Sequence, residues 1–197
     1  MTVPVENAKY QAIMQSAKEL FWKYGIKKVS VEDICLKAAV SKMTFYRFFN
    51  NKVELAKAIF DVIVSDSKRK FREVLQDDCG IPEKITRMIN MKLEGINDIS
   101  KEFLMDLYKN PELGLREHVE KASEDSWNEI ILYFRLAQRK GIFRKDIKPG
   151  FLLYFSKKMG EMVTDETLIS RYGSPAELIR ELTNFFVYGV AERKVKL

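Results

Sequence analysis

The sequence predicts an all-α fold of about nine helices. Apolar residues recur at three- and four-residue spacing along every strongly patterned segment, as in helices that bury one face. Serine, asparagine or proline precedes several of these segments and glycine follows others, which are the residues that begin and end helices. With 46% hydrophobic and 31% charged residues, the chain of 197 residues can form a packed core, and intrinsic disorder is not expected.

The first two helices are predicted from an apolar stripe and two capping residues. Gly25 follows the stripe and suits the left-handed conformation that ends a helix. Ser30 is placed to cap a second helix at about 31–38, with Asp33 in the position of a capping-box acid. The stripe consists of Ile13, Met14, Ala17, Leu20, Phe21 and Tyr24.

The third helix is short and the fourth is long. Ser41 is predicted to cap a helix at about Lys42–Phe49, which Asn50 or Asn51 ends. The same asparagines precede the fourth helix, predicted at about Lys52–Leu75.

Five further helices are predicted downstream. The first follows Pro82, and the second spans about Lys101–Tyr108. A single long helix then includes Leu115 and ends at Gly141. After a loop, the last two helices are expected at about 150–167 and 175–191, the final one capped by Ser174.

Charge is unevenly distributed along the chain. The net charge is +6, and residues 1–55 contribute +4 of it, with nine Lys and Arg against five Asp and Glu. Such a concentration of positive charge is typical of a nucleic-acid contact, although many solvated domains also carry it.

Cys35 and Cys79 are expected to be two reduced thiols, with a disulfide or redox switch as the alternative. The chain shows neither a secretory signal nor a membrane span, so a cytoplasmic location is expected.

The second and third helices have the pattern of a helix-turn-helix motif. Two short helices are separated by a tight turn, and the second has a polar, basic side. Phe45 and Phe49, four positions apart, are expected to anchor its opposite side. The outward side, which suits contact with base edges and phosphates in a major groove, consists of Ser41, Lys42, Met43, Thr44, Tyr46 and Arg47.

The N-terminal region resembles the TetR family of bacterial transcriptional regulators over about fifty contiguous positions. The resemblance rests on Ala17–Phe21, Gly25, Ser30–Ile34, Ala38–Phe49 and Lys52–Leu55. It implies that residues 1–51 form a helix-turn-helix DNA-binding domain of three helices. Residues 52–197 are then expected to form a helical ligand-binding and dimerisation domain.

The resemblance implies roles for individual side chains. Lys42 and Met43 match positions that read bases, since an ammonium donates to guanine and a thioether contacts the thymine methyl. Thr44, Tyr46 and Lys52 match phosphate contacts, with partial burial of Tyr46 and simple solvation of Lys52 as alternatives. The implied DNA-binding residues are Ser30, Ser41, Lys42, Met43, Thr44, Tyr46, Arg47 and Lys52.

Three positions depart from the family pattern. Ala39 stands where glycine is usual, so a left-handed turn there would cost roughly 1 kcal/mol. Met43 also replaces a common glycine, which puts the preferred DNA sequence in doubt. Phe48 replaces a His or Tyr that often donates to phosphate, so one backbone contact is expected to be lost.

The resemblance implies that the last two helices pair with those of a second copy in a four-helix bundle, and their composition agrees. The final helix carries an apolar band wider than one core needs, made of Leu178, Ile179, Leu182, Phe185, Phe186, Val187, Tyr188 and Val190.

His118 is expected at the surface, and no metal site is predicted because no further His or Cys lies near it.

A small-molecule cavity is expected among the middle helices. Its candidate walls are large apolar or amphipathic side chains, for which ordinary core packing is the alternative. They are Phe103, Tyr108, Trp127, Tyr133, Phe134, Phe155, Met159 and Met162.

Together these features predict a ligand-responsive transcriptional regulator. The resemblance implies a repressor, since repression is the commonest mode of the family, although the residues themselves do not separate repression from activation. The protein is expected to bind double-stranded DNA at a palindromic operator as a homodimer and to be released by a small molecule, with no cofactor. Enzymatic activity is not expected, because the chain has no phosphate-binding loop or catalytic motif and only one histidine. The alternative is a helical interaction or sensor module without sequence-specific DNA binding.

Overall fold

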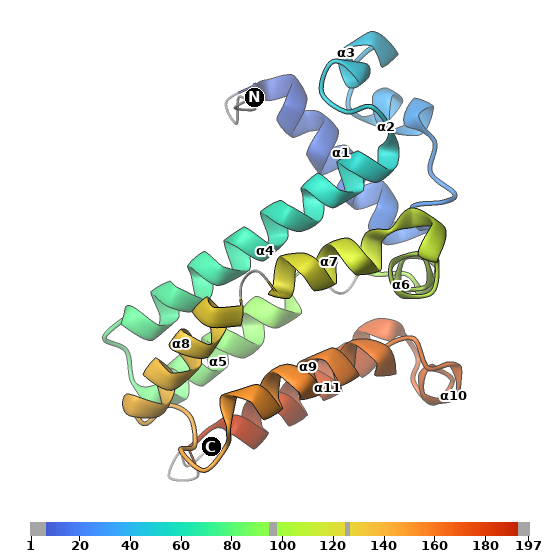
Figure 1. The fold of residues 1–197 in the computed structure, drawn as a ribbon. Coiled ribbons are helices and arrows are strands. Elements are labelled where there is room, and N and C mark those ends of the chain that lie inside the picture. Colours follow the sequence, from blue (N-terminus) through green and yellow to red (C-terminus); the bar gives the residue numbers. More distant parts are fainter. Residues whose placement is uncertain (1–6, 95–97, 125–126, 193–197) are drawn as a thin grey trace. The chain divides into compact units, whose positions relative to one another are not determined.

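The computed structural model describes residues 7–94, 98–124 and 127–192, without the side chains of residues 123, 124, 127 and 153. These residues form eleven α-helices and one short 3-10 helix (Figure 1). The predicted all-α class is confirmed. The elements are α1 (Ala8–Tyr24), α2 (Val31–Lys37), α3 (Lys42–Tyr46), α4 (Lys52–Gln76), α5 (Ile81–Leu93), α6 (Lys101–Tyr108), η2 (Pro111–Leu113), α7 (Leu115–Glu124), α8 (Trp127–Arg139), α9 (Pro149–Met162), α10 (Glu166–Ile169) and α11 (Pro175–Val190).

The chain divides into two compact units. The first contains the residues up to 63 together with 98–120, and the second contains 64–97 and the residues from 121 onward. The predicted functional boundary after residue 51 is a different division, because the first unit also takes in the start of α4 and all of α6. That boundary stays a prediction.

The first unit is built on the buried side of α1. Ile13, Ala17 and Phe21 are fully buried there, and α1 contacts both α2 and α6. Gly25 ends the helix with φ +83°, as predicted, and its N–H donates to the carbonyl of Phe21 at 2.9 Å.

The predicted capping box of α2 is present. The Ser30 Oγ accepts from the Asp33 N–H at 3.1 Å, and the Asp33 Oδ2 accepts from the Ser30 N–H at 2.9 Å. These hydrogen bonds to Ser30 hold the pKa of the Asp33 carboxyl below its usual range. Helix α2 therefore begins at a position that its own side chains define.

Helix α3 ends at Tyr46, so the prediction of a helix up to Phe49 is wrong by three residues. Its cap is as predicted, since the Ser41 Oγ accepts from the Thr44 N–H at 3.1 Å. After Tyr46 the hydrogen bonding tightens, because the N–H groups of Phe48 and Phe49 both donate to the carbonyl of Phe45. This shared acceptor turns the chain and directs Phe49 into the core.

The turn between α2 and α3 contains a strained residue. Ala39 has φ +52°, so the left-handed conformation considered above is present at this position. Among the described residues other than glycine, it is the one with a positive φ.

We expect Ala39→Gly to raise the free energy of unfolding by about 0.5–1 kcal/mol, because relief of left-handed strain exceeds the added backbone entropy of glycine. Urea denaturation followed by circular dichroism measures this change. The neighbouring Ala38 has φ −80°, so Ala38→Gly is the matched control and should destabilise the protein. Equal destabilisation by both substitutions would contradict the strain at residue 39.

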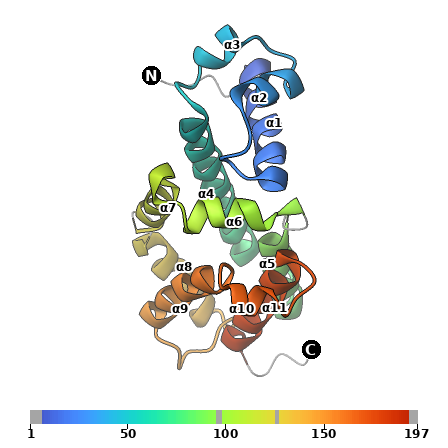
Figure 2. The same ribbon diagram turned by 90° about the vertical axis from the view of Figure 1, so that its right-hand side faces the viewer.

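The second unit has its core among α5, α8 and α11. Figure 2 shows α5 beside α11 and α8 beside α9, in agreement with their contacts. The rings of Phe134 and Phe143 lie 4.7 Å apart within this core. Its buried members are Leu75, Ile85, Met88, Ile89, Phe134, Ala137, Ile142, Phe143, Leu152, Val187, Val190 and Ala191.

Two later predictions of single helices differ from the structure. The predicted helix at about 150–167 ends at Met162, because the side chain of Asp165 caps a separate helix, α10, by accepting from the Leu168 N–H at 2.9 Å. The predicted helix from Leu115 to Gly141 is described as α7 and α8, and residues 125–126 between them lie outside the described residues. These two divisions account for eleven helices where about nine were predicted.

Both cysteines are free thiols, as predicted. Cys35 is buried in the first unit, which raises the pKa of its thiol.

Within the described ranges, no helix combines the length and the apolar composition needed to cross a bilayer.

Candidate nucleic-acid interface

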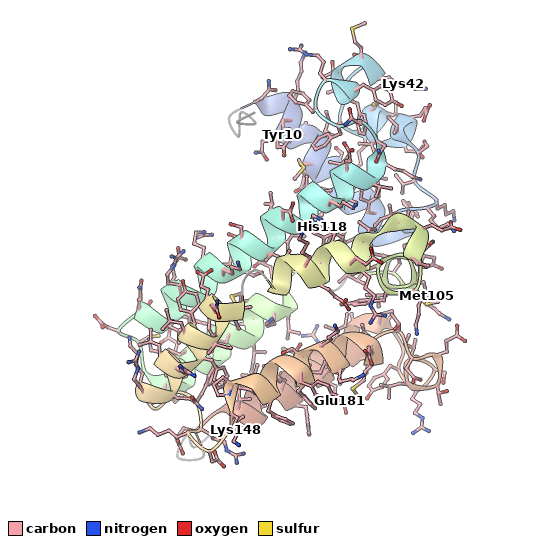
Figure 3. All side chains as sticks on the ribbon, in the orientation of Figure 1. Tyr10, Lys42, Met105, His118, Lys148 and Glu181 are labelled. Atoms are coloured by element: carbon pink, nitrogen blue, oxygen red, sulfur yellow. The ribbon has the colours of Figure 1, made fainter. Side chains whose placement is uncertain are left out.

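The short helix α3 presents polar and basic side chains to solvent while it is anchored from behind. Met43 is 78% exposed and Tyr46 is 53% exposed, whereas Phe45 between them is fully buried. Figure 3 shows Lys42 on α3, where its side chain is more than half exposed. The predicted division of α3 into an outward and a buried side is therefore confirmed.

An aromatic cluster holds α3 against α1. The ring of Tyr10 stacks on Phe49 with centroids 5.3 Å apart and meets the edge of Phe48 at 5.6 Å. Phe45 lies 5.9 Å from Phe49. Burial among these rings raises the pKa of the Tyr10 hydroxyl. Because a helix of five residues has no stability of its own, this cluster fixes the position of α3.

Lys42, which the resemblance places at a base-reading position, forms an ion pair with Glu32 of α2. The pairing raises the pKa of Lys42 and lowers that of Glu32, mainly through their hydrogen bond. Both side chains are more than half exposed, so the pair contributes little to stability. Its effect is on position, because it keeps the Lys42 ammonium beside the N-terminal turn of α2.

Lys52, predicted as a phosphate contact, donates to two main-chain carbonyls. Its Nζ lies 2.7 Å from the Lys27 oxygen and 2.6 Å from the Val29 oxygen. Burial is the largest cause that lowers the pKa of Lys52. An ammonium has three N–H donors, and these two acceptors use two of them. A phosphate contact by Lys52 stays a prediction, and simple solvation of this side chain is not what the structure shows.

The remaining predicted DNA-binding residues lie on or beside α2 and α3. The Ser30 hydroxyl donates to the Asp33 Oδ2 at 2.6 Å, so it is part of the capping box. The Thr44 Oγ1 lies 3.0 Å from the Ser41 Oγ. Arg47 is exposed immediately after α3. The structure thus brings the predicted residues of α2 and α3 to one motif, and their individual contacts with DNA stay predictions.

Two of the predicted ligand-binding residues belong to the first unit. Phe103 is buried, and its ring centroid lies 4.2 Å from that of Trp22. Tyr108 is half-buried, and burial raises the pKa of its hydroxyl. Trp127 is in the second unit, and its side chain lies outside the description.

The others are divided between the core and the surface of the second unit. Phe134 is a core residue, and the Tyr133 hydroxyl donates to the Glu129 Oε1 at 2.6 Å. Phe155 contacts aromatic rings of α11. Met159 is half-buried and Met162 is partly exposed. For Phe134 this is the core packing given above as the alternative, and the role of each residue toward a ligand stays a prediction.

Two residues with evident local importance were not predicted from the sequence. Glu32 pairs with Lys42, and Asp106 of α6 accepts a hydrogen bond from the Lys27 N–H at 2.8 Å across 79 positions of the chain. His118, expected at the surface, is half-buried, and its Nε2 lies 2.7 Å from the Asp61 Oδ1. A sequence pattern carries no signal for contacts between residues so far apart.

Comparison with known proteins agrees with this motif and this fold. Residues 13–59 match the family described as bacterial regulatory proteins, tetR family. The HTH-type transcriptional regulator YhgD of Bacillus subtilis (strain 168) is 26% identical over 137 residues, which are 70% of this chain and 71% of that protein.

Solved structures of similar fold cover nearly the whole chain. The fatty acid degradation regulator FadR from Bacillus halodurans has a TM-score of 0.66 and 19% identity, covering 95% of this chain and 99% of that one. FadR from Bacillus subtilis, solved in complex with stearoyl-CoA, has a TM-score of 0.64 and 17% identity, covering 92% of this chain and 99% of that one. At this level of identity the likeness is one of fold. With the helix-turn-helix of α2 and α3, the match over residues 13–59 identifies the chain as a DNA-binding transcriptional regulator with an N-terminal domain of the tetR family.

Proposed function

We propose that the protein is a ligand-responsive repressor that binds a palindromic operator as a homodimer. A small molecule bound in the C-terminal half releases it from DNA, and it acts in the cytoplasm. The observation that carries the proposal is an exposed aromatic surface on α9 and α11, because dimerisation pairs two copies of the DNA-binding motif.

We define the α9–α11 aromatic surface as Phe151, Tyr154, Phe185 and Tyr188. Their exposed fractions in the single chain are 58%, 62%, 69% and 45%. Phe155 joins the two helices, with its ring 5.9 Å from Phe151 and 6.3 Å from Phe185. Exposed apolar area costs about 25 cal/mol for each Å², so a contiguous aromatic surface favours a partner.

A second copy of the same surface is the partner we propose. A twofold axis brings identical surfaces together, so α9 and α11 of each subunit would form a bundle of four helices. The same axis relates the two copies of α3, which therefore read two half-sites in opposite orientation. A palindromic operator follows from this symmetry.

Release by a small molecule is supported by the C-terminal half and by a structural neighbour. FadR of Bacillus subtilis was solved with stearoyl-CoA, and this chain has the same fold. Met159 and Met162 of α9 are large, adaptable side chains that suit an apolar ligand. A ligand that binds better to the released state lowers DNA affinity by its difference in affinity for the two states, typically about 1–3 kcal/mol.

Selection of DNA from a pool of random duplexes by the unmodified protein tests the proposal. We expect the selected duplexes to share an inverted repeat, and their affinity to fall steeply as salt rises, because phosphate contacts release counterions. Lys42→Ala should change the preferred base within each half-site, whereas Lys52→Ala should weaken all duplexes alike. Binding that enriches no sequence would overturn the operator proposal and favour a helical interaction or sensor module.

A further inference from the structure

The turn between α1 and α2, residues Gly25–Val29, is held from two sides by charged side chains. Asp106 of α6 lies on one side and Lys52 of α4 on the other. All of these residues belong to the first unit. We call this segment the α1–α2 turn.

Asp106 holds the turn from α6. Its side chain is buried, with 8% exposure, and its Oδ2 accepts from the Lys27 N–H at 2.8 Å. Gly25 packs directly on the same helix, since a Cβ at this position would lie 2.9 Å from the Asp106 Oδ2 and 3.1 Å from the Glu102 Cβ. A buried carboxylate that accepts a main-chain N–H forms a strong, directional bond. The turn is therefore both packed on α6 and hydrogen-bonded to it.

Lys52 of α4 binds the same residue, Lys27, through its carbonyl group. Its Nζ donates to the carbonyl oxygens of Lys27 and Val29, so both the N–H and the C=O of Lys27 are engaged by opposite charges. The Asp106 charge also favours the charged form of Lys52, against the larger effect of burial. Removal of Asp106 would thus free the Lys27 N–H and take away a charge that raises the pKa of Lys52.

The turn leads directly into the DNA-facing motif. Ser30, the N-cap of α2, follows Val29 immediately, and Glu32 in the first turn of α2 pairs with Lys42 of α3. Helix α2 has seven residues, so its orientation depends on how the preceding turn is held. A shift of the α1–α2 turn would therefore also move α2 and α3.

We propose that Asp106 is a positioning residue for DNA binding, which acts through the main chain of Lys27 to fix α2 and α3. It touches no DNA itself. A binding site must hold its contact groups to within about 0.5 Å, which is the precision that a supporting hydrogen bond of this kind supplies.

Substitutions at Asp106 separate this role from the effect of charge. Binding is measured by fluorescence anisotropy on a labelled duplex that the unmodified protein has selected from a random pool, below the melting temperature of every variant. We expect Asp106→Ala to weaken binding about tenfold, because the Lys27 N–H loses its acceptor. Asp106→Asn keeps an acceptor oxygen at the same position and should restore most of the affinity.

Glu102→Ala is the matched control on the same helix. It removes the same negative charge from an exposed position. Loss of a negative charge alone favours DNA, so this variant should bind at least as tightly as the unmodified protein. The opposite directions of Asp106→Ala and Glu102→Ala distinguish loss of position from change of charge.

Hydrogen exchange of the Lys27 amide gives a second measurement, and Asp106→Glu gives a second variant. The amide should exchange faster in Asp106→Ala and regain protection in Asp106→Asn. Asp106→Glu keeps the charge but moves the carboxylate, so it should also weaken binding, even if Asp106→Ala does not fold. Unchanged affinity in folded Asp106→Glu, or an affinity in Asp106→Ala equal to that of Glu102→Ala, would overturn the proposal.

Discussion

Replacing Phe45 by alanine is expected to lower the free energy of unfolding by about 3–5 kcal/mol and to abolish DNA binding. Phe45 is fully buried, and its ring lies 5.4 Å from that of Tyr46 and 5.9 Å from that of Phe49. Its removal leaves a cavity under a helix of five residues, which is too short to be stable without packing on its buried side. Urea denaturation and fluorescence anisotropy with a selected duplex measure the two effects.

Met43 provides the matched control for this substitution. It lies on the same helix, two positions before Phe45, and is 78% exposed. Met43→Ala should leave the free energy of unfolding within about 0.5 kcal/mol of the unmodified value. If Phe45→Ala unfolds at the same urea concentration as Met43→Ala, the proposed anchoring of α3 is wrong.

Introducing a charge at Phe185 is expected to separate the proposed dimer. In Phe185→Asp a carboxylate replaces the most exposed ring of the α9–α11 aromatic surface, and its burial against a second copy would require desolvation without a partner. We expect a monomer by sedimentation equilibrium. Affinity for a selected palindromic duplex should fall at least about a hundredfold, since each chain then binds a single half-site.

The control for Phe185→Asp is the same change at an exposed apolar residue outside this surface. Leu132 of α8 is 55% exposed, and Leu132→Asp should leave the mass of the dimer unchanged. Both variants should keep the helical circular dichroism signal, because neither side chain is buried in the single chain. A Phe185→Asp protein that still sediments as a dimer would show that the subunits meet elsewhere.

Helix positions and caps were predictable because their causes are local. The hydroxyl groups of Ser30, Ser41 and Ser174 each accept from the main-chain N–H three residues later, and serine at that position before an apolar stripe is visible in the sequence. The burial of Phe45 and Phe49 was predictable from their four-residue spacing, although Phe49 lies three residues beyond the end of α3.

Contacts between distant parts of the chain were not predictable. The hydrogen bond from Lys27 to Asp106 depends on how α6 packs on α1, and periodicity does not contain that information. Lys52 illustrates the same limit. The sequence alone does not distinguish a lysine exposed to solvent from one that donates to two main-chain carbonyls, as Lys52 does. Periodicity likewise did not distinguish core residues such as Phe134 from residues that line a cavity, because large apolar side chains are common in both places.

The construction of α3 also affects how such a regulator can evolve. Stability comes from Phe45 on its hidden side, whereas Lys42, Met43 and Tyr46 project outward. Exposed positions accept most substitutions at a cost within about 0.5 kcal/mol. Under the proposed function, a change at an outward position of α3 alters the target DNA sequence, while the buried anchor of the helix and its stability are retained.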